Sequence, residues 1–363
     1  MGLKCGIIGL ANVGKTTIFN CMSSTKALTS NVATGTGKSN ISTINVPDNR
    51  LYELEKFQPT ERIVHTTVEI VDIPGLSKTT GKGDGNKFLA DVRNCDALIH
   101  VLRCFDDPSL PHIDGSIDPV RDIETVNFEL QVRDLESVEK KLQKVEKAAK
   151  VGDKEAKKAF EVLSVYKNHL ESFKNASTVP VDEHDKKYVD DLFLLTTKPV
   201  IYVCNVDEKS AVNGNQYSNR VKEFLKDEKT EILIIAGKVE AEISELESED
   251  DRKAFLADVG LTEPGVNKLI RAAYSLLNLE TFFTVGPKEI RAWTIKKGMT
   301  APQAAGVIHS DLERGFIRAE VMKYNDFITL GSEHACREKG KLFVEGKNYV
   351  VEDGDILHIR FNV

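Results

Sequence analysis

The sequence has no paired cysteines and no metal-binding cysteine pattern. Its six cysteines stand singly, without a C-x-x-C pair and without metal-ligand spacing to the eight histidines. These absences argue against a disulfide framework or a zinc-finger scaffold and indicate a reducing compartment. The cysteines are Cys5, Cys21, Cys95, Cys104, Cys204 and Cys336.

Long apolar runs and an excess of basic residues are also missing. No apolar run approaches the length of about 18 residues that a membrane span needs. The segment Met1–Cys5 runs directly into an apolar stretch, in which Gly6 breaks a myristoylation pattern. We therefore expect a soluble cytoplasmic protein with no membrane contact. Lys and Arg number 49 against 56 Asp and Glu, a net charge of -7, so a nucleic-acid partner would need a local basic patch.

Short apolar runs alternate with helix-length segments through the first two thirds of the chain. The 363 residues are enough for two or three domains at about 150 residues each, and 41% of them are hydrophobic. The alternation predicts a doubly wound, mostly parallel α/β sheet with its ligand at the carboxyl ends of the strands. The strand-like runs are Cys5–Ile8, Val68–Val71, Ala97–Leu102, Val200–Cys204 and Ile232–Ile235.

A helical hairpin is predicted between the third and fourth of these runs. Apolar residues recur at spacings of three and four from Phe128 to Ala149, stop at Gly152-Asp153, and resume from Ala156 to Phe173. The stretch Lys140–Lys158 holds eight lysines against three acids, a local charge of +5. These lysines could form a solvated helix surface with ion pairs one turn apart, or they could contact a phosphate backbone.

After about Asn278 the sequence changes to short strand-like segments separated by glycines, which predicts a small mixed α/β domain. We therefore expect one sheet domain formed by residues 1–125 and 197–277. The helical hairpin of residues 126–196 is inserted into it, and residues 278–363 form the terminal domain.

The segment Gly9–Thr16 fits the phosphate-binding pattern G-x-x-x-x-G-K-[ST], between an apolar strand and a helical stretch. In such a P-loop, backbone N–H groups face the phosphates at a helix N-terminus, the lysine neutralises their charge, and the threonine hydroxyl ligates Mg²⁺. We expect nucleotide contacts from this loop and the first helical turn, from Asn12, Val13, Gly14, Lys15, Thr16 and Thr17.

The segment Asp72-Ile73-Pro74-Gly75 follows the next strand of the sheet. After a P-loop, this D-x-x-G pattern predicts a carboxylate at Asp72 that holds Mg²⁺ through water, and a Gly75 amide that senses the γ-phosphate. A plain turn after a strand is the alternative explanation.

A base-reading motif is expected after the fourth predicted strand, where Asn205-Val206-Asp207-Glu208 stands in place of the N-K-x-D of guanine-specific NTPases. The longer Glu208 and the missing lysine weaken the bidentate fit to guanine, so we predict no strong guanine preference. The small residues Ala236 and Gly237 after the next strand would let the backbone approach a base, although an ordinary strand-to-loop turn explains them equally well.

Together these motifs resemble those of the YchF/Obg-like ATPase family of translation-factor-type P-loop NTPases, across essentially the whole chain. The matching segments include Gly9–Thr16, Val46-Pro47-Asp48, Arg50-Leu51, Asp72–Leu76, Arg103-Cys104-Phe105, Asn205–Glu208, Leu277-Asn278-Leu279, Arg291–Ile295, Thr300–Gly306, Gly315–Ala319 and Phe361-Asn362-Val363.

The resemblance implies an NTPase that hydrolyses ATP, with GTP used equally or less well, and that associates with the ribosome, through the large subunit or the whole particle. The terminal domain resembles a TGS domain. This domain and the Lys140–Lys158 arm are the candidate RNA contacts, and we expect a monomer. Leu76 replaces the glutamine that orients water in Ras-like enzymes, and the family's proposed substitute matches His112, which could equally be an ordinary loop residue.

The resemblance also indicates further cation ligands. Thr36 aligns with the switch I threonine that supplies a second Mg²⁺ ligand, and Asn12 matches an asparagine that coordinates K⁺ in some related NTPases. A loop-stabilising hydrogen bond is the alternative role of Asn12. The glycine-rich segment around Thr36 and the short stretch Ser77–Gly85 depart from the family's switch sequences, which bears on hydrolysis more than on binding.

Two further functions fit parts of the sequence. One is a ribosome- or RNA-binding regulator whose nucleotide binding matters but whose hydrolysis is vestigial, which the altered switches favour. The other is a small-molecule P-loop kinase, which the Asn205 motif and the TGS-like segment disfavour.

Overall fold

The computed structural model describes residues 3–24, 40–75 and 82–362, which form two compact units. Within these residues, unit 1 comprises residues 3–24, 40–42 and 69–266, and unit 2 comprises residues 43–68 and 267–362. The predictions for Thr36, for Leu76 and for residues 77–81 lie outside the described residues.

Unit 1 is built on a six-stranded sheet with the strand order β2-β4-β1-β5-β6-β7. Strands β4, β1, β5, β6 and β7 pair in parallel, which confirms the predicted doubly wound sheet. All eight residues of β5 are buried, as expected for a central parallel strand covered on both faces. The strands are β1 (Lys4–Ile8), β2 (Asn40–Asn45), β4 (Thr67–Asp72), β5 (Ala97–Cys104), β6 (Val200–Val206) and β7 (Glu231–Ile235).

The strand order places the carboxyl end of β1 where the chain changes its direction of winding. From β1 the sheet extends to β4 on one side and to β5 on the other, so a crevice is expected between the connections that leave these strands. The helices of unit 1 outside the hairpin are α1 (Lys15–Ser23), α3 (Lys82–Arg93), α6 (Gln216–Phe224), α7 (Gly237–Glu245) and α8 (Glu249–Val259). Helix α9 (Gly265–Leu276) belongs to unit 2 from Asn267 onward.

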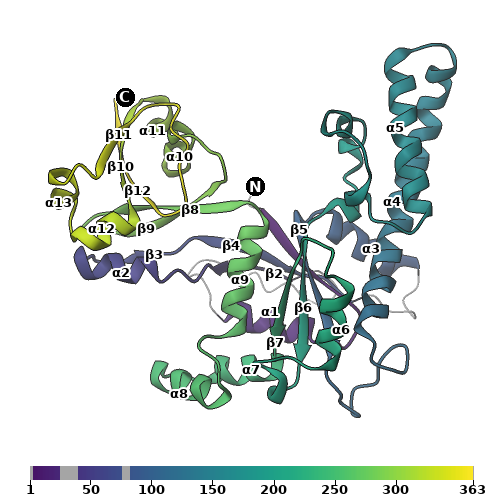
Figure 1. The fold of residues 1–363 in the computed structure, drawn as a ribbon, viewed down its shortest axis with the longest axis horizontal. Coiled ribbons are helices and arrows are strands. Elements are labelled where there is room, and N and C mark those ends of the chain that lie inside the picture. Colours follow the sequence, from purple (N-terminus) through teal and green to yellow (C-terminus); the bar gives the residue numbers. More distant parts are fainter. Residues whose placement is uncertain (1–2, 25–39, 76–81, 363) are drawn as a thin grey trace. The chain divides into compact units, whose positions relative to one another are not determined.

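The predicted hairpin is confirmed as α4 (Pro119–Lys150) and α5 (Lys154–Glu171), which pack along each other and project from the sheet (Figure 1). Asp118 caps α4 by accepting from the N–H groups of Val120 and Arg121, so this helix begins nine residues before Phe128. Gly152, at a φ of 99°, makes the turn between the helices. The seam between the helices buries Val138, Val162, Leu163, Tyr166 and Leu170.

Short 3₁₀ turns lead the chain from α5 back to β6. The buried carboxylate of Asp134 on α4 accepts hydrogen bonds from Leu195 N at 2.7 Å, Thr196 N at 2.8 Å and Thr196 Oγ1 at 2.7 Å. This contact fixes the returning chain against the base of the arm. The turns are η1 (Ala176–Thr178), η2 (Glu183–Tyr188), η3 (Asp190–Leu192) and η4 (Leu195–Thr197), and η5 (Glu208–Ser210) follows β6.

Unit 2 contains a second six-stranded sheet, with the order β11-β10-β12-β8-β9-β3. The sequence predicts strand-like segments at Arg291–Ile295, Phe316–Val321 and Ile356–Phe361, and these are confirmed as β9, β10 and β12. The strands are β3 (Ile63–Val64), β8 (Leu279–Val285), β9 (Ile290–Lys296), β10 (Phe316–Lys323), β11 (Leu342–Glu345) and β12 (Asp355–Phe361).

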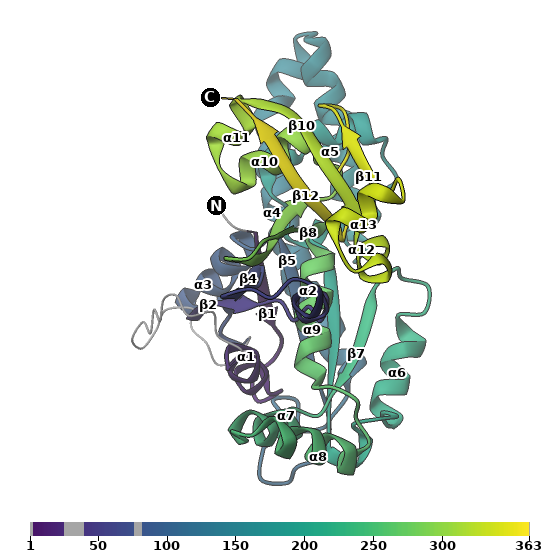
Figure 2. The ribbon, with the colours of Figure 1, turned by 90° about the vertical axis from the view of Figure 1, so that its left-hand side faces the viewer.

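Two successive residues of β8 pack into two different hydrophobic cores, on opposite faces of this sheet. Phe282 packs with α10 (Ala301–Ile308), and α11 (Ser310–Arg314) lies beside it (Figure 2). Phe283 packs with α2 (Arg50–Phe57), α12 (Tyr324–Leu330) and α13 (Glu333–Glu338). Residues 43–68, which precede β4 in the chain, are therefore part of unit 2. The domain limits predicted from the sequence stay a prediction.

Two absences complete the description. Among the described residues, no helix combines the length and apolar character needed to cross a bilayer. All six cysteines are free and buried.

Candidate nucleotide site

The loop between β1 and α1 has the backbone of a phosphate-binding loop. Gly9 and Gly14 have φ values of 141° and 97°, and Asn12 adopts a left-handed φ of 61°. A Cβ on Gly14 would lie 2.2 Å from Nδ2 of Asn205, so both the conformation and the close approach require glycine there. The loop ends at the N-terminus of α1, where unpaired N–H groups and the helix dipole favour an anion.

Lys15 is the first residue of α1, and its buried side chain returns over the loop. Its Nζ donates to the carbonyl oxygen of Leu10 at 2.6 Å. Burial lowers the pKa of Lys15 to about 8, although the nearby charge of Asp72 acts in the opposite direction. Gly75 lies beside the ammonium group, because a Cβ on Gly75 would be 2.5 Å from Nζ. A buried ammonium group whose charge is not fully offset by nearby anions favours a phosphate ligand.

Thr16 and Asp72 form a pair of oxygen donors next to Lys15. The Thr16 hydroxyl donates to Oδ2 of Asp72 at 3.1 Å. Burial raises the pKa of Asp72 above its usual range, against the lowering effects of the Thr16 hydrogen bond and the Lys15 charge. A hydroxyl and a carboxylate at this separation are hard ligands of the type that Mg²⁺ prefers, so these residues fit that ion.

Asn205, at the end of β6, holds the P-loop through its side-chain amide. Its Nδ2 donates to the carbonyl of Val13 at 2.9 Å, and its Oδ1 accepts from the N–H of Gly237 at 2.9 Å. One side chain thereby ties the P-loop to the start of α7. The role as a strut is a property that the sequence did not indicate, and a base contact by Asn205 stays a prediction.

The other predicted base-side residues divide into buried and exposed ones. Val206 and Ala236 are buried, and Gly237 is the first residue of α7. Glu208 is exposed at the start of η5, and Asp207 caps that turn by accepting from Ser210 N. The carboxylate of Glu208 is therefore accessible to a ligand.

Arg103 is a buried residue whose role the sequence did not predict. At the end of β5, its guanidinium group donates to the carbonyl oxygens of Phe105, Asp107 and Leu110 at 3.3, 3.1 and 2.7 Å. It also lies 4.9 Å from the centre of the Phe105 ring. Three carbonyl acceptors hold the charge and fix the loop that leads to His112. The R-C-F motif was the only sequence signal for this arrangement.

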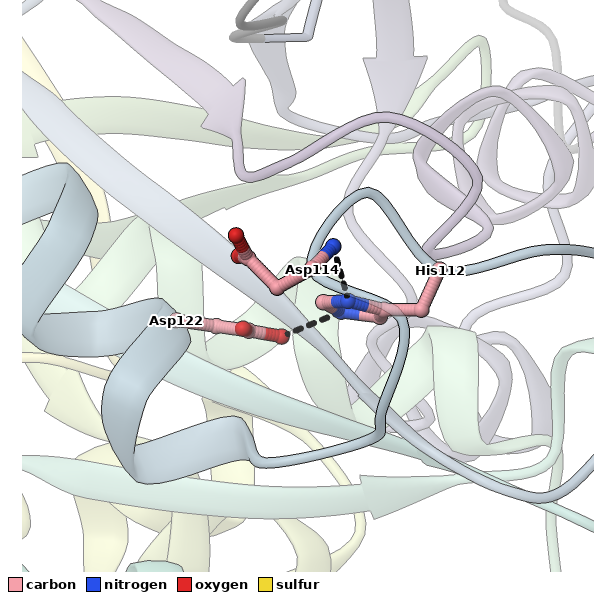
Figure 3. A group of neighbouring side chains, drawn as sticks. All are labelled: His112, Asp114 and Asp122. Carbon is pink, nitrogen blue, oxygen red and sulfur yellow. Dashed lines mark hydrogen bonds and ion pairs between the residues drawn. The ribbon is translucent and has the colours of Figure 1, made fainter.

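The side chain of His112 is buried in a cluster with Asp114 and Asp122 (Figure 3). Its Nε2 lies 3.0 Å from Oδ2 of Asp122, and its Nδ1 accepts from the N–H of Asp114 at 3.1 Å. Both ring nitrogens are thus engaged with the protein in this conformation. Burial raises the pKa of Asp122, and the contacts with His112 and Arg121 oppose that effect.

The side chains of His112, Asp114 and Asp122 are close enough together to bind one metal ion. The positively charged side chain of Arg121, however, already contacts two of them. Arg121 places Nη2 3.5 Å from Nδ1 of His112 and 3.5 Å from Oδ1 of Asp122. Because its guanidinium group already offsets the negative charge of the carboxylates, we assign no metal to the cluster.

The predicted site residues therefore fall into two groups. Contacts in the structure join Lys15, Thr16 and Asp72 to one another, and Asn205 joins the P-loop to Gly237. Among residues 3–24, 40–75 and 82–362, no hydrogen bond links His112 or Glu208 to Lys15, Thr16 or Asp72. Thr36 lies outside the described residues.

Comparisons with known proteins agree over the whole chain. A family model described as "50S ribosome-binding GTPase" matches residues 4–162, and the model YchF-GTPase_C, described as "Protein of unknown function (DUF933)", matches residues 279–362. The "Ribosome-binding ATPase YchF" of Bacillus subtilis is 46% identical and that of Escherichia coli O157:H7 is 43% identical, each over 100% of both chains. The solved "Structure of the Schizosaccharomyces pombe YchF GTPase" covers 99% of this chain and 98% of that chain, with a TM-score of 0.87 and 33% identity.

Proposed function

The chain belongs to the YchF family, and from that membership we propose that it is a Mg²⁺-dependent ATPase that associates with the ribosome. The observation that carries the proposal is the meeting of Lys15, Thr16 and Asp72 beneath a P-loop backbone. Its curated relatives are named ribosome-binding ATPases, whereas the solved relative from fission yeast is named a GTPase.

The nucleotide phosphates bind to the P-loop in this proposal. Backbone N–H groups of residues 12–17 and the ammonium group of Lys15 hold the phosphate oxygens. The amide of Gly75, a residue that lies beside the Lys15 ammonium group, senses the terminal phosphate. Thr16 and Thr36 would hold Mg²⁺, and Asp72 would hold it through water. The metal offsets charge on the phosphates when it is bound. Asn12 would offer K⁺ one side-chain oxygen, and no step is assigned to K⁺.

The experiment for this part is nucleotide binding by the Lys15→Ala variant. The loss of the buried Lys15 ammonium group should abolish ATP binding in equilibrium dialysis, while the circular dichroism spectrum keeps its wild-type shape. Wild-type affinity in this variant would remove the P-loop from the proposal.

Adenine is accepted at least as well as guanine in this proposal. Support comes from Glu208, whose longer side chain replaces the aspartate that guanine readers use, and from the absence of a lysine at position 206. Competition between labelled ATP and GTP tests this. A tenfold preference for GTP, about 1.4 kcal/mol, would contradict it, and Glu208→Asp should shift the ratio toward GTP.

His112 orients the attacking water in the proposed hydrolysis, once it separates from Asp122. The variant His112→Ala should keep its ATP affinity and lose turnover, because only the reacting state uses the imidazole. Phosphate release under single-turnover conditions measures this directly. Unchanged turnover in His112→Ala would end the assignment.

A second candidate function follows from the same cluster. Both nitrogens of His112 are engaged with Asp114 and Asp122, and this arrangement favours a regulator that binds ATP without depending on its hydrolysis. Sedimentation with ribosomes separates the two functions. Equal association with ATP, with ADP and without nucleotide favours the regulator, whereas association that follows the bound nucleotide favours the ATPase switch.

We propose that the arm and the TGS-like domain contact ribosomal RNA, and that the protein acts in the cytoplasm as a monomer. Of the eight lysines in Lys140–Lys158, three form ion pairs with acids: Lys141, Lys150 and Lys158. Lys147 and Lys154 are exposed near the tip of the arm. Charge reversal at these two should weaken ribosome sedimentation, and reversal at Lys222 and Lys229, exposed lysines outside the arm, should not.

A further inference from the structure

The base of the arm carries a cavity of about 430 Å³ that the proposed nucleotide chemistry does not use. We call it the arm-base pocket. Its wall on α4 is formed by Glu124, Asn127, Phe128 and Gln131, whose spacing places them on one face of that helix. Residues from the end of α5, from η1 and from the end of α6 complete the lining, and α4 packs on α6 in unit 1 (Figure 1). The volume suits one large side chain with its adjoining backbone.

Three phenylalanines line this pocket and are unusually accessible. Phe128, Phe173 and Phe224 have 48%, 69% and 43% of their surface exposed. The rings of Phe128 and Phe173 lie 5.8 Å apart, with their planes inclined at 32°. Exposed aromatic rings gathered in one concave site, in contrast to single apolar residues scattered over a surface, mark a binding site.

The backbone of Phe173 provides an independent indication that its ring is needed. It has a left-handed φ of 57° directly after Ser172, the C-cap of α5, where glycine is the favoured residue. Buried Gln131 holds this conformation, because its Nε2 donates to the carbonyl of Phe173 at 3.4 Å and to Oδ1 of Asn175 at 2.7 Å. A bulky residue in this backbone conformation is strained, and strain at an exposed ring points to function.

The charged groups around the rings give the pocket a negative balance. Glu124 and Glu228 line it, and within the described parts of the chain neither carboxylate forms an ion pair. Partial burial raises the pKa of Glu228, and a bound cation would oppose that effect by favouring the carboxylate. Lys174 is the one cation of the lining. In such a site a cation is attracted both by the charge of the carboxylates and by the quadrupoles of the aromatic rings.

We propose that the arm-base pocket binds an arginine side chain presented by an extended, basic segment of a partner protein. Arginine fits better than lysine because its planar guanidinium group stacks on an aromatic ring while its N–H groups fork to a carboxylate. None of the pocket residues is among those proposed to hold the nucleotide, so we expect the peptide to bind with or without ATP.

The test is fluorescence anisotropy of the full chain with a labelled peptide, acetyl-(Gly-Arg)₄-amide. The same peptide with citrulline in place of arginine removes the charge and keeps the shape, and a lysine version keeps the charge. We expect binding of the arginine peptide to be about tenfold tighter than that of the citrulline peptide, with the lysine peptide between them. Saturation with ATP and Mg²⁺ should leave these affinities unchanged.

Variants of the pocket distinguish this site from general attraction to an acidic protein. Phe173→Ala, and the double change Glu124→Gln with Glu228→Gln, should each weaken binding by about tenfold. Phe343→Ala and Glu247→Gln, which alter an exposed ring and an exposed acid elsewhere, should leave it unchanged. Equal binding of the citrulline peptide, or an affinity of Phe173→Ala within about twofold of wild type, would overturn the proposal.

A second measurement separates a binding role of Phe173 from a structural one. Phe173→Gly and Phe173→Ala both lack the ring, but only glycine adopts the left-handed backbone without strain. We expect both variants to lose peptide binding, to keep wild-type ATP hydrolysis, and to differ in melting temperature, with the glycine variant higher. A glycine variant that melts no higher than the alanine variant would remove the argument from backbone strain.

Discussion

The lysine of the P-loop makes nucleotide binding sensitive to alkaline pH. Burial lowers the pKa of Lys15 to about 8 without a ligand, so the free site loses its positive charge as the pH rises through that value. Bound phosphates favour the charged form. ATP binding above pH 8 must therefore take up a proton, and affinity should fall by up to about tenfold for each further pH unit.

Calorimetry in buffers of different ionisation enthalpy measures this proton uptake. At pH 9 the heat of ATP binding should vary with the buffer in the direction of uptake, and at pH 6.5 the contribution of Lys15 should be absent. ATP is already fully ionised at pH 9, which leaves the protein as the source of the effect. Buffer-independent heats at pH 9 would show that the ammonium group keeps its charge without nucleotide.

The hydrogen bonds of Asn205 should contribute to both stability and binding. In Asn205→Ala, the carbonyl of Val13 and the N–H of Gly237 lose their partner in a buried place, which should cost about 2–3 kcal/mol of unfolding free energy. The P-loop also loses its rear support, so ATP affinity should fall. Asn205→Asp keeps the acceptor for Gly237 but turns a carboxylate oxygen toward the Val13 carbonyl in a buried place, so it should cost at least as much as the alanine change. Urea unfolding measures both, and a cost below about 0.5 kcal/mol in the alanine variant would contradict the strut role.

Motif spacing was sufficient to predict the neighbours Lys15, Thr16 and Asp72, because a P-loop and the next parallel strand bring their ends together in any sheet of this class. It was not sufficient for Asn205, whose two partners lie 192 and 32 residues away. The same limit applies to Arg103, because contacts with irregular loop carbonyls leave no periodic pattern in a sequence.

At the scale of the element, one buried carboxylate fixes the returning chain against the base of the helical arm. Asp134 on α4 holds the start of η4 through three hydrogen bonds, and Thr196 in turn accepts from Ala176 N at 2.9 Å. Asp134→Ala would leave these donors buried without an acceptor, which should cost about 3 kcal/mol. Lys140→Ala, an exposed change on the same helix, should cost less than about 0.5 kcal/mol.

Hydrogen exchange shows whether this loss is local. Amide protection in η1 and η4 should fall in Asp134→Ala, while the β-sheet of unit 1 keeps its protection. Unchanged exchange in these turns, together with wild-type stability, would mean that the arm is held by its apolar seam alone.

The predictability of the elements follows their length and pattern. The five parallel strands and the arm were predicted because β-branched runs and three-to-four spacing are long, local signals. The strands β2, β3, β8 and β11 were missed. Strand β3 has only two residues, and it is held by pairing with β9 more than 200 residues away, which no local pattern reports.

At the scale of the whole molecule, unit 2 is discontinuous in sequence. The change in composition after Asn278 indicates where most of this unit begins, but it carries no sign of the earlier segment 43–68. That segment contributes Leu51 and Leu54, both fully buried, to a core that also contains Phe283 and Ile290. Burial of each leucine stabilises unit 2 by about 2 kcal/mol.

A chain truncated after residue 277 should therefore contain unit 1 together with an incomplete part of unit 2. It keeps Leu51 and Leu54 but lacks β8 and β9, so apolar surface that is buried in the full chain becomes exposed. We expect residues 1–277 to bind a hydrophobic dye and to aggregate on heating. Leu51→Ser with Leu54→Ser in the truncated chain should suppress both effects. If residues 1–277 instead remain monomeric, bind no dye and melt in one sharp transition, then residues 43–68 have a stable packing of their own that does not depend on the rest of unit 2.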